Sequence, residues 1–229
     1  MQASLGKLIT VPVRSVWPDE AKDFTPWLAK SENLNLLAKE LGFREFELIS
    51  EEQQIDGPDK FKVDIYASIP QIRSKVIIEN QLDESDHKHL GELITYASGL
   101  NANYVVWIVT NAREAHQQAI DWLNENISES INFFLVKVSV LQIDDSQKAV
   151  QFSVLRKPNG WLKQIKQSYE LSETQNLILE YWEKYYEIAK QNSEFMKYMN
   201  PMKPSHRSWT NISIGKGDRY RLSLSLSPK

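Results

Sequence analysis

The sequence predicts an α/β protein: a mixed β-sheet flanked by helices, followed by a small appendage of a helix and a β-hairpin. Between residues 8 and 155, segments with strand character alternate with segments of helical periodicity, as in sheets covered by helices. Two short runs, 76–78 and 104–109, are continuously apolar, which is typical of strands buried on both faces. Lys157-Pro-Asn-Gly160 then interrupts the pattern, so we expect one domain over 1–160 and a C-terminal module over 161–229.

The first predicted elements are an edge strand and a helix. Residues 8–16 alternate apolar and polar positions and contain Pro12, which a strand tolerates only at an edge or a bulge. Thr25 is the expected N-cap of the helix, with Pro26 at the first helical position, where its missing N–H has no intrahelical partner. Leucines recur after it at helical spacing, and Gly42 is expected to end the helix.

The middle of the domain is predicted to continue with alternating strands and helices. A turn signal, Asp56-Gly-Pro-Asp59, separates the second and third strands. Ser85 or Asp86 is the expected cap of a helix that ends at Gly99-Leu-Asn101. A further helix is predicted over 114–126, and the predicted strands are 46–49, 61–69, 75–79, 104–110, 132–140 and 150–155.

The C-terminal module is predicted to begin with a long helix over 172–198 and to end with a hairpin of strands 209–214 and 220–226. The last strand alternates Leu and Ser, so one of its faces is apolar. Such an edge strand needs a partner, so we expect the module to be incomplete or to be completed by another subunit in a homodimer. One side of the long helix is expected to be a packing face and consists of Leu177, Tyr181, Trp182, Tyr185 and Ile188.

Composition narrows the class of protein. The 229 residues carry 27 Lys and Arg against 30 Asp and Glu, with 41% hydrophobic residues, as in ordinary globular proteins. The sequence contains no cysteine, which excludes a disulfide framework, a thiolate zinc site and a cysteine nucleophile. No apolar run approaches the ~20 residues of a membrane span, and the N-terminus lacks a signal-peptide pattern, so we expect a soluble, cytoplasmic protein without a membrane partner.

Charge is distributed unevenly along the chain. Residues 1–155 carry 14 basic and 23 acidic side chains, whereas residues 156–229 carry 13 basic and 7 acidic ones. An acidic body and a basic C-terminal part indicate two modules with different electrostatic tasks.

The chemistry-bearing residues concentrate between positions 64 and 96. Neither a GxxxxGK[ST] phosphate loop nor a GxSxG nucleophile elbow occurs. Asp64 lies inside an apolar strand and Glu79 follows three β-branched residues, although burying an unpaired charge is unfavourable by several kcal/mol. Pairing of these strands as a hairpin would bring both carboxylates to one end of the sheet, with Gln81 pointing the same way as Glu79. Converging carboxylates with a polar neighbour suit Mg²⁺.

The spacing Asp64…Glu79-Asn80-Gln81 resembles the PD-(D/E)XK nuclease signature, with Gln81 at the usual lysine position. Over about residues 5–165 the chain is similar to uncharacterised bacterial proteins of this restriction-endonuclease-like fold. The remainder resembles the start of a domain of unknown function that often follows such domains. The matching stretches are Trp17-Pro-Asp-Glu-Ala-Lys-Asp-Phe-Thr-Pro-Trp27, Val63-Asp-Ile, Ile78-Glu-Asn-Gln-Leu82, Asp86-His-Lys-His-Leu-Gly91 and Thr95-Tyr-Ala97.

This resemblance implies a role for each matching residue. Asp64 and Glu79 match the metal-binding carboxylates, and Glu32 matches a glutamate that adds a ligand from the first helix. Gln81 replaces a lysine that positions water and stabilises charge on the phosphate; a neutral amide orients water but supplies no positive charge. Lys62, two residues before Asp64, is the candidate for supplying that charge.

The segment Asp86-His87-Lys88-His89 allows two interpretations. At a helix start the two histidines do not face each other, which favours Asp86 as the cap and one histidine packed against the sheet. The alternative is a zinc or manganese site. His87 is also an accessory candidate for the metal site, because its helix begins soon after the strand that carries Glu79.

Together these features predict a Mg²⁺- or Mn²⁺-dependent endonuclease that hydrolyses DNA phosphodiester bonds, with Asp64, Glu79 and Gln81 as catalytic residues. Two alternatives remain open: a catalytically inactive nucleic-acid-binding or assembly module on the same scaffold, which Gln81 favours, and a metal-dependent hydrolase of a small substrate. Basic residues of the C-terminal part are expected to contact the DNA backbone in a salt-dependent manner, namely Lys203, Arg207, Lys216, Arg219 and Arg221.

Overall fold

The computed structural model describes residues 5–54, 62–127, 131–201, 203–205, 207–214 and 220–226. The chain divides into two compact units, residues 1–165 and 166–229. The long helix α5 (Trp161–Gln191) begins in the first unit and continues through this division. No helix in the described ranges combines the length and the apolar character needed to cross a membrane.

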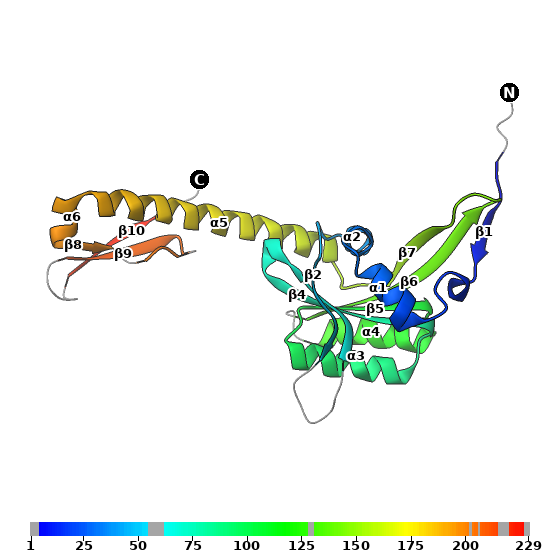
Figure 1. Cartoon of the computed structure of the whole chain (residues 1–229). Coiled ribbons are helices and arrows are strands. Elements are labelled where there is room, and N and C mark those ends of the chain that lie inside the picture. The colour runs from blue at the N-terminus through cyan, green and yellow to red at the C-terminus, as the bar shows by residue number, and fades with distance from the viewer. Residues whose placement is uncertain are drawn as a thin grey trace. The chain divides into compact units, whose positions relative to one another are not determined.

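A mixed β-sheet forms the centre of the first unit (Figure 1). Strands β4, β5 and β6 are parallel, and the remaining pairings are antiparallel, which confirms the predicted mixed sheet. The strand order is β1-β6-β5-β4-β3-β2, with β7 also paired to β6. The strands in the described part of the chain are β1 (Leu8–Val11), β2 (Glu47–Gln54), β3 (Lys62–Ile69), β4 (Ser74–Glu84), β5 (Tyr104–Asn111), β6 (Asn132–Ile143) and β7 (Ala149–Arg156).

Helices cover both faces of this sheet. Helices α3 (His87–Leu100) and α4 (Glu114–Asn126) lie on one face, and the N-terminal helices lie on the other (Figure 1). The apolar residues 76–78 of β4 are fully buried, as their sequence predicts for a central strand. The core beneath α3 and α4 includes Ile77, Leu93, Tyr96, Val105, Trp107, Ile120 and Leu135.

The N-terminal helical region differs from the prediction at its start. The first turn is π-helical, η2 (Glu20–Phe24), and Asp19 caps it by accepting a hydrogen bond from the N–H of Lys22. Helix α1 (Thr25–Leu28) follows directly, and α2 (Ser31–Glu40) begins after extended backbone at Lys30. The prediction of Thr25 as N-cap is therefore wrong, because its hydroxyl is buried and accepts a hydrogen bond from the Asn80 side chain.

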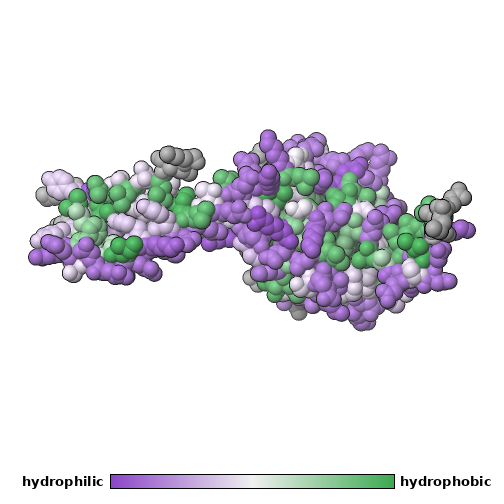
Figure 2. Space-filling model, turned by 90° about the horizontal axis from the view of Figure 1, so that it is seen from above, coloured by the Kyte–Doolittle hydropathy of each residue, from purple (hydrophilic) through white to green (hydrophobic). Residues whose placement is uncertain are grey.

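The end of that helical region and the first strand follow the sequence signals more closely. Gly42 has φ +87°, the left-handed conformation expected of a residue just after a helix. Strand β1 lies at the sheet edge but is shorter than predicted, because residues 13–15 form a 3₁₀ turn, η1 (Val13–Ser15), after Pro12. Its side chains Leu8 and Ile9 remain exposed, and Figure 2 shows hydrophobic surface at this end of the unit.

The second unit pairs its helices with a small sheet. Helix α6 (Ser193–Tyr198) follows α5, and the three strands described, β8 (Met199–Pro201), β9 (Trp209–Ile214) and β10 (Arg221–Ser225), have the order β10-β9-β8. The predicted hairpin is confirmed as β9–β10. Strand β8 had no sequence signal, because it is three residues long and ends at a proline.

The predicted packing face of the long helix is only partly buried. Trp182 is 3% exposed and its indole N–H donates to the carbonyl of Arg207 at 2.7 Å. Leu177, Tyr181 and Ile188 are more than half exposed, because the short strands cover only part of the helix surface. The prediction therefore holds for Trp182 and for the half-buried Tyr185, whose ring contacts it, and fails for Leu177, Tyr181 and Ile188.

Candidate metal centre

The pairing of β3 with β4 brings Asp64 and Glu79 together. The antiparallel register pairs Ile65 with Ile78, so Asp64 and Glu79 are the next opposed positions. The Asp64 Oδ2 atom accepts a hydrogen bond of 2.7 Å from the N–H of Asn80. In return, the backbone N–H of Asp64 interacts with the Glu79 carboxyl. Each side chain is thus held by the backbone of the opposite strand.

Glu79 is buried and Asp64 is half-buried, and this raises the pKa of both carboxyl groups. Glu79 is 6% exposed, and within the described residues its Oε2 atom is buried without a hydrogen-bond partner. Burial, followed by repulsion from Asp64, raises the pKa of Glu79 to about 10. Burial likewise raises the pKa of Asp64 to about 7, although the N–H of Asn80 opposes this shift. The two groups therefore resist carrying negative charge together unless a cation compensates them.

Two further acidic residues act on this pair. Glu20, from the π-helical turn, accepts a hydrogen bond from the N–H of Leu82 and repels both Asp64 and Glu79. Glu52 lies in β2 between the residues paired with Val63 and Ile65, which places it opposite Asp64. Its φ of +49° is a conformation that is unfavourable by about 1–2 kcal/mol for a residue with a Cβ atom. Backbone strain of this kind is common at functional sites.

Glu32 does not take the place expected from the resemblance. It is exposed in the first turn of α2, and it is not among the main electrostatic influences on Asp64 or Glu79. Glu20 is the glutamate of the N-terminal helical region that acts on them. The π-helical turn begins before the predicted helix start. It places Glu20, rather than Glu32, against Leu82 near the end of β4.

Helix α3 places a histidine and a glutamate beside Glu79. Ligand atoms of Glu79, His89 and Glu92 all lie within 4.8 Å of one another. His89 and Glu92 are three residues apart and therefore share one helix face. Farther along this face, Tyr96 is buried, and burial followed by repulsion from Glu79 raises the pKa of its hydroxyl. Glu92 was not among the predicted site residues, although a His-x-x-Glu spacing on a predicted helix was a usable signal.

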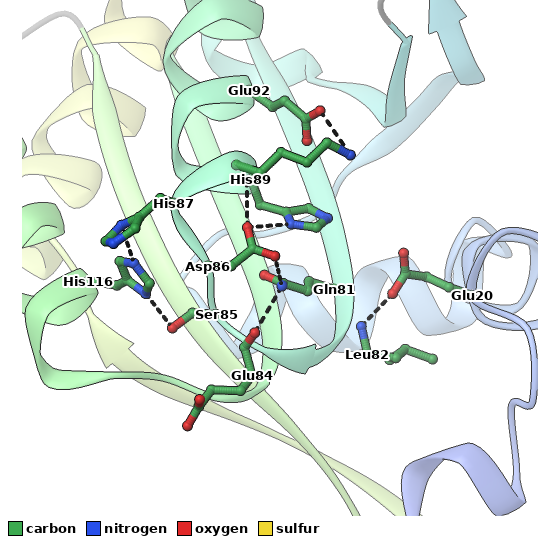
Figure 3. Close-up of polar contacts among 11 residues, drawn as sticks. Glu20, Gln81, Leu82, Glu84, Ser85, Asp86, His87, His89, Glu92 and His116 are labelled. Atoms are coloured by element: carbon green, nitrogen blue, oxygen red, sulfur yellow. Dashed lines mark hydrogen bonds and ion pairs between the residues drawn. The ribbon is translucent and has the colours of Figure 1, made fainter.

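Gln81 fixes the connection between β4 and α3 (Figure 3). Its side-chain NH₂ donates to Asp86 Oδ2 at 2.8 Å and to the Glu84 carbonyl at 2.9 Å. Asp86 caps α3 as predicted, because its Oδ1 atom accepts from the N–H of His89. The same Oδ1 lies 2.9 Å from His89 Nδ1. The Gln81 amide therefore orients the Asp86 carboxylate, which orients His89.

His87 belongs to a different chain of hydrogen bonds (Figure 3). Its Nδ1 atom lies 2.9 Å from Nε2 of His116, and Nδ1 of His116 lies 2.7 Å from the hydroxyl of Ser85. The structure thus places His87 against His116, and His89 beside Glu79. Residues two apart in the first turn point in different directions, as expected for a helix.

The predicted basic residues fall in both units of the chain. Lys62, in β3, is exposed and forms an ion pair of 3.8 Å with Glu52, the neighbour of Asp64. Lys203, Arg207 and Arg221 belong to the second unit, where all three are exposed and the Arg207 guanidinium lies over the Trp209 ring. Lys216 and Arg219, together with the predicted turn at 56–59, lie outside the described residues.

Comparisons with known proteins find only distant similarity. No family profile matches the sequence, and no curated protein matches it. The chain is similar to a repair endonuclease from Pyrococcus abyssi, with 16% identity, 43% of this chain and 42% of that chain covered, and a TM-score of 0.33. SfsA from Pyrococcus furiosus, solved in complex with Ca²⁺, has 12% identity, coverages of 57% and 59%, and a TM-score of 0.30.

A protein of unknown function from Silicibacter pomeroyi is similar at 14% identity, with coverages of 66% and 86% and a TM-score of 0.24. The chain spans less than two thirds of the length of the first two structures.

The residues of this site fit a divalent cation. A buried carboxylate oxygen without a hydrogen-bond partner is unfavourable by about 1–3 kcal/mol, and by more when it is charged. Binding a ligand at Glu79 Oε2 would remove this unfavourable term. The raised pKa values of Asp64 and Glu79 show that positive charge is needed to hold both in the ionised form. Carboxylate oxygens are the ligands that hard divalent cations prefer.

Proposed function

We propose that this protein is a divalent-metal-dependent endonuclease that hydrolyses DNA phosphodiester bonds, with Mg²⁺ or Mn²⁺ as its cofactor. One observation carries the proposal. Asp64 and Glu79 are opposed on neighbouring strands, Glu79 is buried and Asp64 half-buried, and Glu79 Oε2 has no partner within the described residues. Such a pair is unfavourable for stability alone and favourable for holding a cation.

The chain's own residues would divide the work as follows. Asp64 and Glu79 would hold the ion, and Glu20, which repels both, would add negative charge to attract it. A bound divalent cation supplies the positive charge that neutralises this pair and polarises a phosphate. Gln81 would act as a positioning residue, because its NH₂ group is committed to Asp86 and Glu84. Lys62 is the basic side chain near Asp64 that could meet the substrate, provided that it leaves Glu52.

DNA is the proposed substrate because the second unit carries exposed basic side chains. Lys203, Arg207 and Arg221 are exposed there and would contact the phosphate backbone without reading sequence. Lys216 and Arg219 are proposed for the same role from the sequence alone.

A second candidate function is a catalytically inactive nucleic-acid-binding or assembly module. It is favoured by the position of Gln81, where a neutral amide engaged in two hydrogen bonds stands in place of a cation. Such a module need bind no metal ion, so the two candidates differ in a measurable way.

The test is cleavage of linear and circular DNA by the full chain with Mg²⁺, with Mn²⁺ and with a chelator. Asp64→Asn keeps an oxygen that accepts from Asn80 and removes the charge, so cleavage should fall by about 1,000-fold, the equivalent of several kcal/mol of transition-state stabilisation. Asp83→Asn is the matched control, because Asp83 is exposed and pairs only with Arg14 among the ion pairs of the described residues. Cleavage that survives Asp64→Asn, or that needs no divalent cation, contradicts the proposal.

A further inference from the structure

We propose that His89 is a ligand of the metal ion at Glu79 and Glu92, and that this site prefers a first-row transition metal, Mn²⁺ or Co²⁺, over Mg²⁺. The proposal deepens the proposed function and rests on it only in placing a divalent cation beside Asp64 and Glu79. It concerns the identity of the ion and one nitrogen ligand from α3.

The first support is the position of the three side chains. Ligand atoms of Glu79, His89 and Glu92 lie within 4.8 Å of one another, a span that one ion can bridge. Glu79 is more than nine-tenths buried, and its Oε2 atom lacks a hydrogen-bond partner within the described residues. A buried oxygen of this kind, unlike an exposed acidic cluster, points to a ligand.

The second support is the way His89 is held. Asp86 Oδ1 lies 2.9 Å from His89 Nδ1, and Gln81 holds the other oxygen of Asp86 at 2.8 Å (Figure 3). Because the Asp86 carboxylate accepts a hydrogen bond from Nδ1–H, Nε2 is the ring nitrogen left to bind an ion. A carboxylate that orients a histidine in this way is the usual outer partner of a metal-binding imidazole.

The neighbouring contacts are compatible with an ion at this place. Glu92 Oε1 lies 3.5 Å from Lys88 Nζ, and the Lys88 side chain is 76% exposed. Such surface ion pairs contribute little to stability, so an incoming cation can replace Lys88 beside Glu92.

The ligand set determines the choice of ion. Mg²⁺ is held by oxygen ligands and keeps several waters, whereas imidazole nitrogen is a better ligand for transition metals. In the usual affinity order Co²⁺ binds more tightly than Mn²⁺ at a mixed nitrogen and oxygen site. A site of two or three carboxylates with one imidazole therefore favours these ions over Mg²⁺.

The experiment measures the ion directly, without a cleavage assay. Mn²⁺ is added to the metal-free full chain, and pulsed electron paramagnetic resonance detects coupling to a bound ¹⁴N nucleus. We expect coupling from one imidazole in the wild type and its loss in His89→Gln. Mn²⁺ affinity should fall at least about 10-fold in that variant, whereas Mg²⁺ affinity, measured by competition, should change by less than about threefold.

His87→Gln is the matched control, because it removes an imidazole two residues away that contacts His116 instead. It should keep both the ¹⁴N coupling and the Mn²⁺ affinity. The wild-type spectrum is decisive by itself if His89→Gln does not fold. Mn²⁺ bound without nitrogen coupling, or no Mn²⁺ binding at all, overturns the proposal.

The two proposals can fail separately. DNA cleavage in Mg²⁺ together with an absence of ¹⁴N coupling would overturn the imidazole ligand and uphold the proposed function. Coupling from His89 without cleavage of any DNA substrate would uphold the ligand and overturn the nuclease.

Discussion

Two chains of hydrogen bonds leave the end of β4, and both use the first turn of α3. One runs from Gln81 through Asp86 to His89, beside the buried Glu79. The other runs from Ser85 through His116 to His87, which is exposed. Both end at a histidine in the first turn of α3, and they differ in whether the buried polar atoms along them have hydrogen-bond partners.

In the second chain, both ring nitrogens of the buried histidine have hydrogen-bond partners. His116 is 1% exposed, with Ser85 at one ring nitrogen and His87 at the other. The Ser85 hydroxyl also accepts the N–H of Arg113. In the first chain, Gln81 Oε1 and Glu79 Oε2 are buried without partners in the described part of the chain. A completed network stabilises the fold, whereas an incomplete one is where a ligand is expected.

The largest expected effect on stability concerns the completed chain. His116→Ala removes a buried ring that contacts Trp107 and leaves the Ser85 hydroxyl without its partner, so the free energy of unfolding should fall by about 2–4 kcal/mol. His87→Ala breaks the same 2.9 Å contact from the exposed side and should lower it by less than about 1 kcal/mol. Denaturant unfolding of both variants measures the difference, and equal losses would contradict a structural role centred on His116.

Neutralising the buried carboxyl beside the first chain should instead stabilise the metal-free protein. In the metal-free protein at pH 8, Glu79→Gln removes a carboxyl that folding forces to keep its proton, so the free energy of unfolding should rise by about 1–3 kcal/mol. The same variant should lose divalent-cation binding. Unfolding in the presence of a chelator, at pH 5 and at pH 8, tests this result.

The pH dependence follows from the direction of each shift. Folding raises the pKa of Glu79 from 4.5 to about 10 and that of Asp64 from 3.8 to about 7. Between the two pKa values of each group, the folded state binds more protons than the unfolded state. Stability of the metal-free protein therefore falls as pH rises through these windows. Burial and the neighbouring His87 lower the pKa of His116 below 6.5, so its contribution is lost as pH falls. A stability gain in Glu79→Gln that is equal at pH 5 and pH 8 would contradict the assignment.

The sequence identified the part of the site that depends on strand periodicity. Asp64 and Glu79 stand out because charged residues interrupt apolar strands, and a hairpin between those strands can be inferred from their spacing. Glu20 and Glu52 were missed for a different reason. Their positions depend on a π-helical turn and on a left-handed residue within a strand, and neither leaves a periodic signal.

The same distinction holds for the fold. Helix 114–126 was predicted with its observed bounds and β5 to within one residue, because their apolar patterns are regular. The start of β4 was predicted to within one residue, but the strand continues five residues beyond the predicted end at Glu79, where polar residues follow. Thr25 was misassigned because a hydroxyl followed by proline is a local cap signal, whereas its partner, Asn80, is 55 residues away. Which of the two nearby histidines faces Glu79 also depended on tertiary packing, since both lie in the first turn of α3.

The smallest expected effect is at the exposed residue between the two histidines. Lys88→Gln breaks only a surface ion pair with Glu92, so the free energy of unfolding should change by less than about 0.5 kcal/mol. If Glu92 is a metal ligand, removing this competing cation should strengthen Mn²⁺ binding by about two- to threefold at low salt, and less at high salt. Titration with Mn²⁺ at two ionic strengths measures the change. Weaker binding in Lys88→Gln would mean that the lysine supports the site, and Glu92 would then belong with the structural contacts of the helix.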